Sequence, residues 1–128
     1  MFDDVSIDVI IGETFDSVVG EVGGETIRFL RADGTGFKMY HDQNCCESVT
    51  VEDICGSLED LIGSPIRLAS ADTNSETNPD GTGPQDDYDS FTWTFYNIAT
   101  AKGHVTIRWY GESNGYYSES VDIMEIKA

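Results

Sequence analysis

Residues 90–110 carry the pattern that most restricts what this chain can fold into. The segment 90–99 (SFTWTFYNIA) alternates aromatic with polar side chains, and after an AKG turn the segment 104–110 (HVTIRWY) alternates again. A period of two places successive side chains on opposite faces of an extended strand. The two segments therefore predict an antiparallel hairpin. Their aromatic and β-branched side chains predict that this hairpin forms the core of the sheet.

Other segments have a similar strand-like composition and are separated by turn-forming residues. Gly23 and Gly24 separate the first two of these strands, and the sequence ADGTG at 32–36 separates the second from the third. Both sequences are typical of hairpin turns, because glycine adopts positive φ without steric cost. The strands predicted in addition to the central hairpin are 16–22, 26–31, 37–41, 49–54, 65–71 and 117–126.

One or two short helices are also predicted. Ser57 begins the sequence SLED, which is close to a capping box, and Gly63 favours termination shortly afterwards. The segment 2–11 is compatible with a strand or a helix. The sequence IGETF at 11–15, which begins at the last residue of this segment, echoes the sequence IGSPI at 62–66 that follows the clearer helix, and this similarity favours a helix. The predicted class is α+β: a single domain of mostly antiparallel β-sheet, with about seven strands.

The charge of the chain limits its partners. Its 128 residues include 24 acidic and 7 basic side chains, which gives a net charge of −17. A field of this sign repels phosphates, so direct binding to nucleic acid or to an anionic membrane is disfavoured, whereas a basic protein surface is attracted. The alternative is that the acidity serves solubility alone. We expect one domain over residues 1–128, with 72–89 as a long, acidic, flexible loop.

Three cysteines and a histidine form a candidate metal site. Zinc prefers thiolate and imidazole ligands in a tetrahedral set of four, and the candidate ligands are His41, Cys45, Cys46 and Cys55. An acidic neighbour could replace one of the adjacent cysteines. Two alternatives stay open: three free thiols that are merely packed, or a catalytic pair in which Cys45 or Cys46 is the nucleophile and His41 the base.

Aromatic and acidic residues near the C-terminus could recognise a partner protein. The segment 109–119 (WYGESNGYYSE) combines both kinds of side chain; the alternative is a hairpin end whose tyrosines flank the turn. With the acidic loop, the candidate partner-binding residues are Asp86, Asp87, Asp89, Glu112, Tyr116, Tyr117 and Glu119. No phosphate-binding glycine loop, Ser/His/Asp set or paired-carboxylate motif is present, so no catalytic residue is assigned.

Two motifs resemble those of a known family. They are MYHDQNCCESV at 39–49, continuing to LEDLIG at 58–63, and WTFY at 93–96, continuing to VTIRWYGESNGYYS at 105–118. Together they are similar to a family of small acidic phage and prophage proteins catalogued as a domain of unknown function. The resemblance implies a phage origin and carries no established activity.

The favoured function is inhibition of a host defence nuclease by binding. A small, acidic phage protein without a catalytic set has the profile of anti-CRISPR inhibitors, several of which act as DNA mimics in basic grooves of Cas effectors. We therefore expect a Cas effector, favouring the Cas9 type, as the partner in the host cytoplasm. One alternative is a metal- or thiol-dependent enzyme using His41 and Cys45 or Cys46. Another is a structural or assembly protein of the virion.

Overall fold

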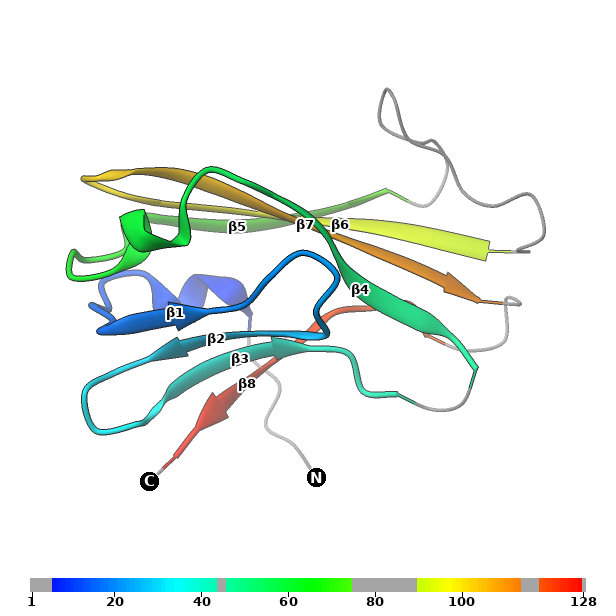
Figure 1. Cartoon of the computed structure of the whole chain (residues 1–128), viewed down its shortest axis with the longest axis horizontal. Coiled ribbons are helices and arrows are strands. Elements are labelled where there is room, and N and C mark those ends of the chain that lie inside the picture. Colours follow the sequence, from blue (N-terminus) through cyan, green and yellow to red (C-terminus); the bar gives the residue numbers. More distant parts are fainter. Residues whose placement is uncertain (1–5, 44–45, 75–89, 114–117, 128) are drawn as a thin grey trace.

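The part of the chain that the structure describes forms two four-stranded antiparallel sheets stacked face to face (Figure 1). The computed structural model describes residues 6–43, 46–74, 90–113 and 118–127. The elements in chain order are η1 (Ile7–Ile10), β1 (Ser17–Val19), β2 (Thr26–Leu30), β3 (Gly36–Tyr40), β4 (Ser48–Cys55), η2 (Leu58–Leu61), β5 (Leu68–Asn74), β6 (Ser90–Thr100), β7 (Gly103–Ser113) and β8 (Asp122–Ile126). The strand orders are β1-β2-β3-β8 in one sheet and β4-β7-β6-β5 in the other.

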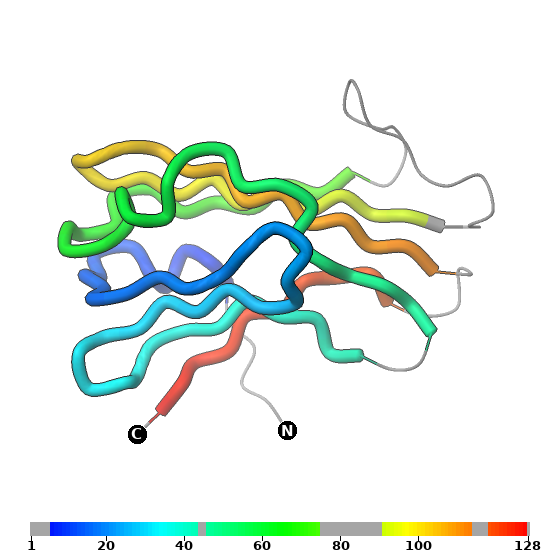
Figure 2. Tube along the Cα trace, viewed as in Figure 1, coloured from blue at the N-terminus to red at the C-terminus, as the bar shows by residue number. Residues whose placement is uncertain are grey.

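The same order of elements occurs twice along the chain. A 3-10 helix is followed by three strands that pair consecutively, first as η1 and β1 to β3 and then as η2 and β5 to β7. The fourth strand of each half crosses to the other sheet: β4 pairs with β7, and β8 pairs with β3. Each sheet therefore takes three strands from one half of the chain and one from the other (Figure 2).

The short sequence similarity between IGETF and IGSPI has a structural counterpart. Each sequence begins directly after a 3-10 helix, and its glycine has positive φ, 88° at Gly12 and 76° at Gly63. The two segments also bind each other, since the Gly12 N–H donates to the Ile66 carbonyl at 2.8 Å and the Gly63 N–H donates to the Phe15 carbonyl at 2.8 Å. The similarity thus marks equivalent positions of the two halves.

The prediction of helices is correct in position and wrong in type. Residues 7–10 and 58–61 form 3-10 helices of four residues each, and the described residues contain no α-helix. Ser57 caps the second as predicted, because its side chain accepts a hydrogen bond from the Glu59 N–H at 3.3 Å. The second lies between two glycines with positive φ, Gly56 and Gly63, which leaves too little chain for α-helix nucleation there. Neither helix is long or apolar enough to cross a membrane.

The antiparallel β-architecture is confirmed, although it is divided between two sheets. The predicted hairpins are present, and the β6–β7 hairpin occupies the centre of its sheet. The predicted strand 65–71 instead spans Leu68–Asn74, because Ile66 is bound to the segment that follows η1. The final strand is shorter than predicted and begins at Asp122. Of the predicted loop 72–89, residues 72–74 belong to β5, and 75–89 lie outside the described residues.

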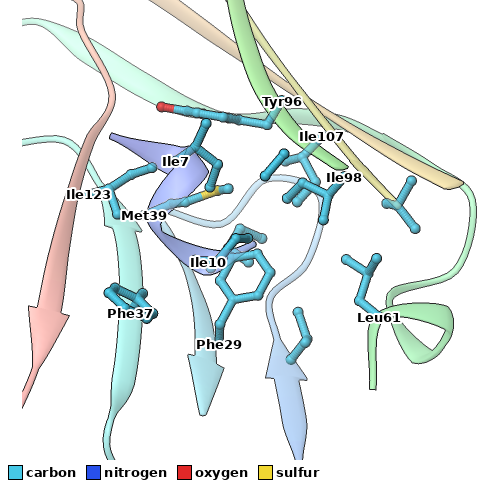
Figure 3. Close-up of a cluster of buried hydrophobic side chains, with 14 of the residues drawn as sticks. Ile7, Ile10, Phe29, Phe37, Met39, Leu61, Tyr96, Ile98, Ile107 and Ile123 are labelled. Carbon is cyan, nitrogen blue, oxygen red and sulfur yellow. The ribbon is translucent and has the colours of Figure 1, made fainter. Parts of the chain in front are cut away.

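The core lies between the two sheets, and η1 contributes Ile7 and Ile10 to it (Figure 3). Ile10 from η1 and the inward side chains of the central hairpin, Ile98 and Ile107, are 0% exposed. Two aromatic side chains of β6 pack in different places. Tyr96 packs into the core between the sheets, whereas Trp93 packs on Tyr110, with ring centroids 4.5 Å apart. Burial of this continuous apolar cluster is the main stabilising contribution to the fold.

Candidate partner-binding site

The two crossings between the sheets meet at His41. This residue follows β3, and its Nδ1 lies 2.7 Å from the carbonyl oxygen of Ser120 in the second crossing. Its Nε2 lies 2.7 Å from Oε2 of Glu47, which precedes β4. The Ser120 carbonyl oxygen only accepts hydrogen bonds, so Nδ1 donates to it, and Nε2 donates to the Glu47 carboxylate when the ring is protonated, which makes this contact an ion pair. The two side chains are 3% and 0% exposed, so this buried pair fastens one crossing to the other.

The same contacts decide how the predicted metal ligands are placed. Both ring nitrogens of His41 have partners, while Cys55 lies at the far end of β4, about 23 Å along a strand of this length. Cys46 is disulfide-bonded and Cys55 carries an exposed free thiol. Cys45 lies outside the described residues. Within the described ranges, no group of three or more His, Cys, Asp or Glu residues could hold a metal ion. Zinc binding at the 41–46 segment therefore stays a prediction.

Two of the predicted partner-binding residues lie within the described part of the chain. Glu119 is buried, and both its oxygens accept hydrogen bonds, from Thr92 Oγ1 at 2.8 Å and from Ser113 Oγ at 2.5 Å. Its carboxylate therefore ties the segment before β8 to the β6–β7 hairpin. Glu112 lies on β7 beside Phe91 of β6. The other five, Asp86, Asp87, Asp89, Tyr116 and Tyr117, lie outside the described residues.

Most of the negative surface charge is not compensated by basic side chains. Arg31 binds Glu13 at 2.8 Å. Arg108 binds Glu52 at 2.5 Å, where an irregularity between Val51 and Asp53 in β4 brings that glutamate beside the guanidinium. Exposed acidic residues whose carboxylates make neither an ion pair nor a hydrogen bond within the described ranges are Asp8, Asp16, Glu21, Glu25, Asp42, Glu59, Asp72 and Glu125.

Two adjoining hollows lie between the edge strands β5 and β8. They have volumes of about 460 and about 390 Å³, and both are lined by Ala71, Tyr96 and Val121. The Tyr96 hydroxyl donates to the Val121 carbonyl at 3.4 Å. Burial, with a smaller contribution from the Asp122 carboxylate, raises the pKa of Tyr96, so this hydroxyl remains a donor at physiological pH. We call the two hollows together the β5–β8 groove.

Sequence reasoning missed this groove because its walls come from four separate parts of the chain. Asp8 lies on η1, Ala71 on β5, Tyr96 on β6 and Asp122 on β8. The one local signal is the composition of β5, LASADTN, which is small and polar and therefore typical of an edge strand. Which other edge would face it depends on the exchange of strands between the halves, and no local pattern encodes that exchange.

Comparison with known proteins identifies a family without identifying an activity. No curated protein and no solved structure matches the chain. A family profile described as a domain of unknown function (DUF7448) matches residues 8–123, which run from η1 to the start of β8. The chain therefore belongs to the DUF7448 family.

Proposed function

We propose that this protein is a phage-encoded inhibitor of a host defence nuclease, with a Cas9-type effector as the favoured target. It acts by binding and not by catalysis. Its acidic side chains occupy a basic nucleic-acid groove of the effector and reduce the binding of target DNA. The phage origin in this proposal rests on the resemblance of the two motifs described above.

The observation that carries the proposal is the uncompensated negative surface on a rigid β-sandwich. The chain has 24 acidic and 7 basic side chains, and two of the basic ones, Arg31 and Arg108, are already paired internally. Exposed carboxylates held on a fixed scaffold attract a basic groove at long range, and they lose little conformational freedom when they dock. His41, the one candidate base of the alternative enzyme, has both nitrogens bound and is buried.

The test is inhibition of DNA cleavage by a purified Cas9–guide RNA complex. We expect cleavage to fall in one-to-one proportion to the added protein, and DNA binding in a gel-shift assay to fall in parallel. Both effects should weaken as salt increases, because exposed charge pairs are screened. A variant with amides in place of the eight exposed carboxylates named above is the matched control and should inhibit weakly. Its circular dichroism spectrum would verify that it is folded.

Two outcomes would contradict the proposal. Unchanged cleavage at an excess of about tenfold over the effector would exclude inhibition by occupancy, since a stoichiometric binder saturates its target there. Inactivation of many effector molecules by one molecule of this protein would indicate catalysis instead. The order of addition is a separate check. When this protein is added after the effector has bound its target DNA, it should have little effect on cleavage, because the protein and the DNA compete for one groove.

A further inference from the structure

The two lateral sides of the sandwich are closed to different extents. On one side the turn between β1 and β2 bonds to β4, since the Gly23 N–H donates to the Val51 carbonyl at 2.7 Å and the Val51 N–H donates to the Gly24 carbonyl at 2.9 Å. On the other side β5 and β8 are the outermost strands of their sheets, and within the described ranges neither has a strand partner on its outer side. The β5–β8 groove lies between them.

The lining of the groove suits an extended polypeptide. An outermost strand presents backbone N–H and C=O groups that an incoming strand can pair with, which is the usual basis of strand addition. Hydroxyl groups line the groove, from Ser70 and Thr73 on β5, Thr94 on β6 and Ser120 before β8. Hydroxyls both donate and accept, so they tolerate the alternating polar groups of a main chain.

The charges at the groove select among polypeptides. Asp8 and Asp122 line the larger hollow, and Glu119 lines the smaller one. No lysine or arginine is among the described residues that line either hollow. A segment carrying positive side chains is therefore attracted, while an acidic segment is repelled.

We propose that the β5–β8 groove receives an extended, lysine- or arginine-bearing segment of a partner protein, which adds as a strand along the outer edge of β5. This inference rests on the proposed function in one respect, namely that the chain binds a basic partner. It adds which part of the surface binds that partner. The carboxylates of Asp8 and Asp122 bind its positive side chains, and the edge of β5 binds its backbone.

The probe is a fluorescent peptide of about nine residues that alternates lysine with threonine or valine, a length that matches an edge strand. A peptide with glutamate in place of lysine is its control. We expect anisotropy to show salt-dependent binding of the lysine peptide alone. Hydrogen exchange should show new protection of backbone amides in β5 and not in β1.

Two pairs of variants locate the binding site. Asp8→Asn with Asp122→Asn should weaken peptide binding about fivefold, because two charge contacts at the rim are lost. Asp16→Asn with Glu59→Gln changes the net charge equally away from the groove and should bind as the unmodified protein does. Ala71→Lys on β5 places a positive charge where the strand would add and should abolish binding.

The control for that last variant is Ala101→Lys in the β6–β7 turn, where the residue is exposed, and it should leave peptide binding intact.

Equal binding of the two peptides, or equal effects of groove and control variants, would overturn the inference. A dimer in sedimentation equilibrium that Ala71→Lys dissociates would also overturn it, because a second copy would then be the occupant. If the protein inhibits the nuclease and the groove variants inhibit equally well, the groove fails as the site while the proposed function stands. If peptide binding follows the expected pattern without nuclease inhibition, the proposed function fails alone.

Discussion

Removal of His41 should destabilise the protein strongly, because the buried Glu47 carboxylate then loses its ion pair with the imidazole ring. The Glu47 side chain is 0% exposed, and the 2.7 Å contact to Nε2 is its ion pair. Breaking one partner of a buried ion pair costs about 3–5 kcal/mol. His41→Leu keeps a similar volume, so most of this cost is electrostatic. His41→Leu combined with Glu47→Leu removes both charged groups and should be no less stable than the single variant.

The measurement is urea unfolding followed by tryptophan fluorescence, with thermal unfolding in parallel. In a domain of this size a decrease of 1 kcal/mol in the free energy of unfolding lowers Tm by about 4 °C, so His41→Leu should lower Tm by about 12–20 °C. The double-mutant cycle should show a coupling of at least about 2 kcal/mol. Glu59→Gln on the surface is the control and should change stability by less than about 0.5 kcal/mol. A cost below about 1 kcal/mol for His41→Leu, or additive single changes, would refute the reasoning.

Three further predictions concern single positions. Gly36→Ala should lower the free energy of unfolding in urea by about 3 kcal/mol or more, because the added Cβ would lie 1.8 Å from the Phe29 carbonyl oxygen. Gly34 is also at positive φ but has open space around it, so Gly34→Ala should cost only about 1–2 kcal/mol. Equal costs would contradict this prediction. A hydrogen bond to Asp53 raises the pKa of the Cys55 thiol, so less thiolate is present near neutral pH, and Asp53→Asn should speed alkylation by iodoacetamide in mass spectrometry; an unchanged rate would oppose this assignment. Glu119→Ala should destabilise by about 1–3 kcal/mol by stranding two hydroxyls, and Glu119→Gln by less; similar thermal midpoints for both would show that the carboxylate is not structural.

Local sequence patterns predicted the strands well and their assembly poorly. The alternation in 104–110 correctly placed Val105, Ile107 and Trp109 on one face, and all three are buried. The turn at Gly23 and Gly24 was also correctly predicted, because turn geometry depends on residues that are adjacent in sequence. The division into two sheets could not be predicted, since the pairing of β3 with β8 depends on contacts between distant segments.

The candidate site shows the same limit. His41 attracted attention beside the cysteines, yet its partners are Glu47 and a backbone carbonyl of the second crossing. A carbonyl partner has no side-chain signature, so the sequence alone could not predict this contact. Glu119 was predicted to face a partner and is bound internally, because its hydroxyl partners come from two other strands.

The exchange of fourth strands has a consequence for synthesis of the protein on the ribosome. β1, β2 and β3 emerge early, but the strand that completes their sheet is β8, at residues 122–126. The edge of β3 thus stays exposed until almost the whole described chain has left the exit tunnel, and the early half cannot fold to completion by itself. Pairing between such distant segments is slow, and an unpaired strand edge favours aggregation while it lasts. The nascent chain should therefore depend on chaperones more than its small size suggests.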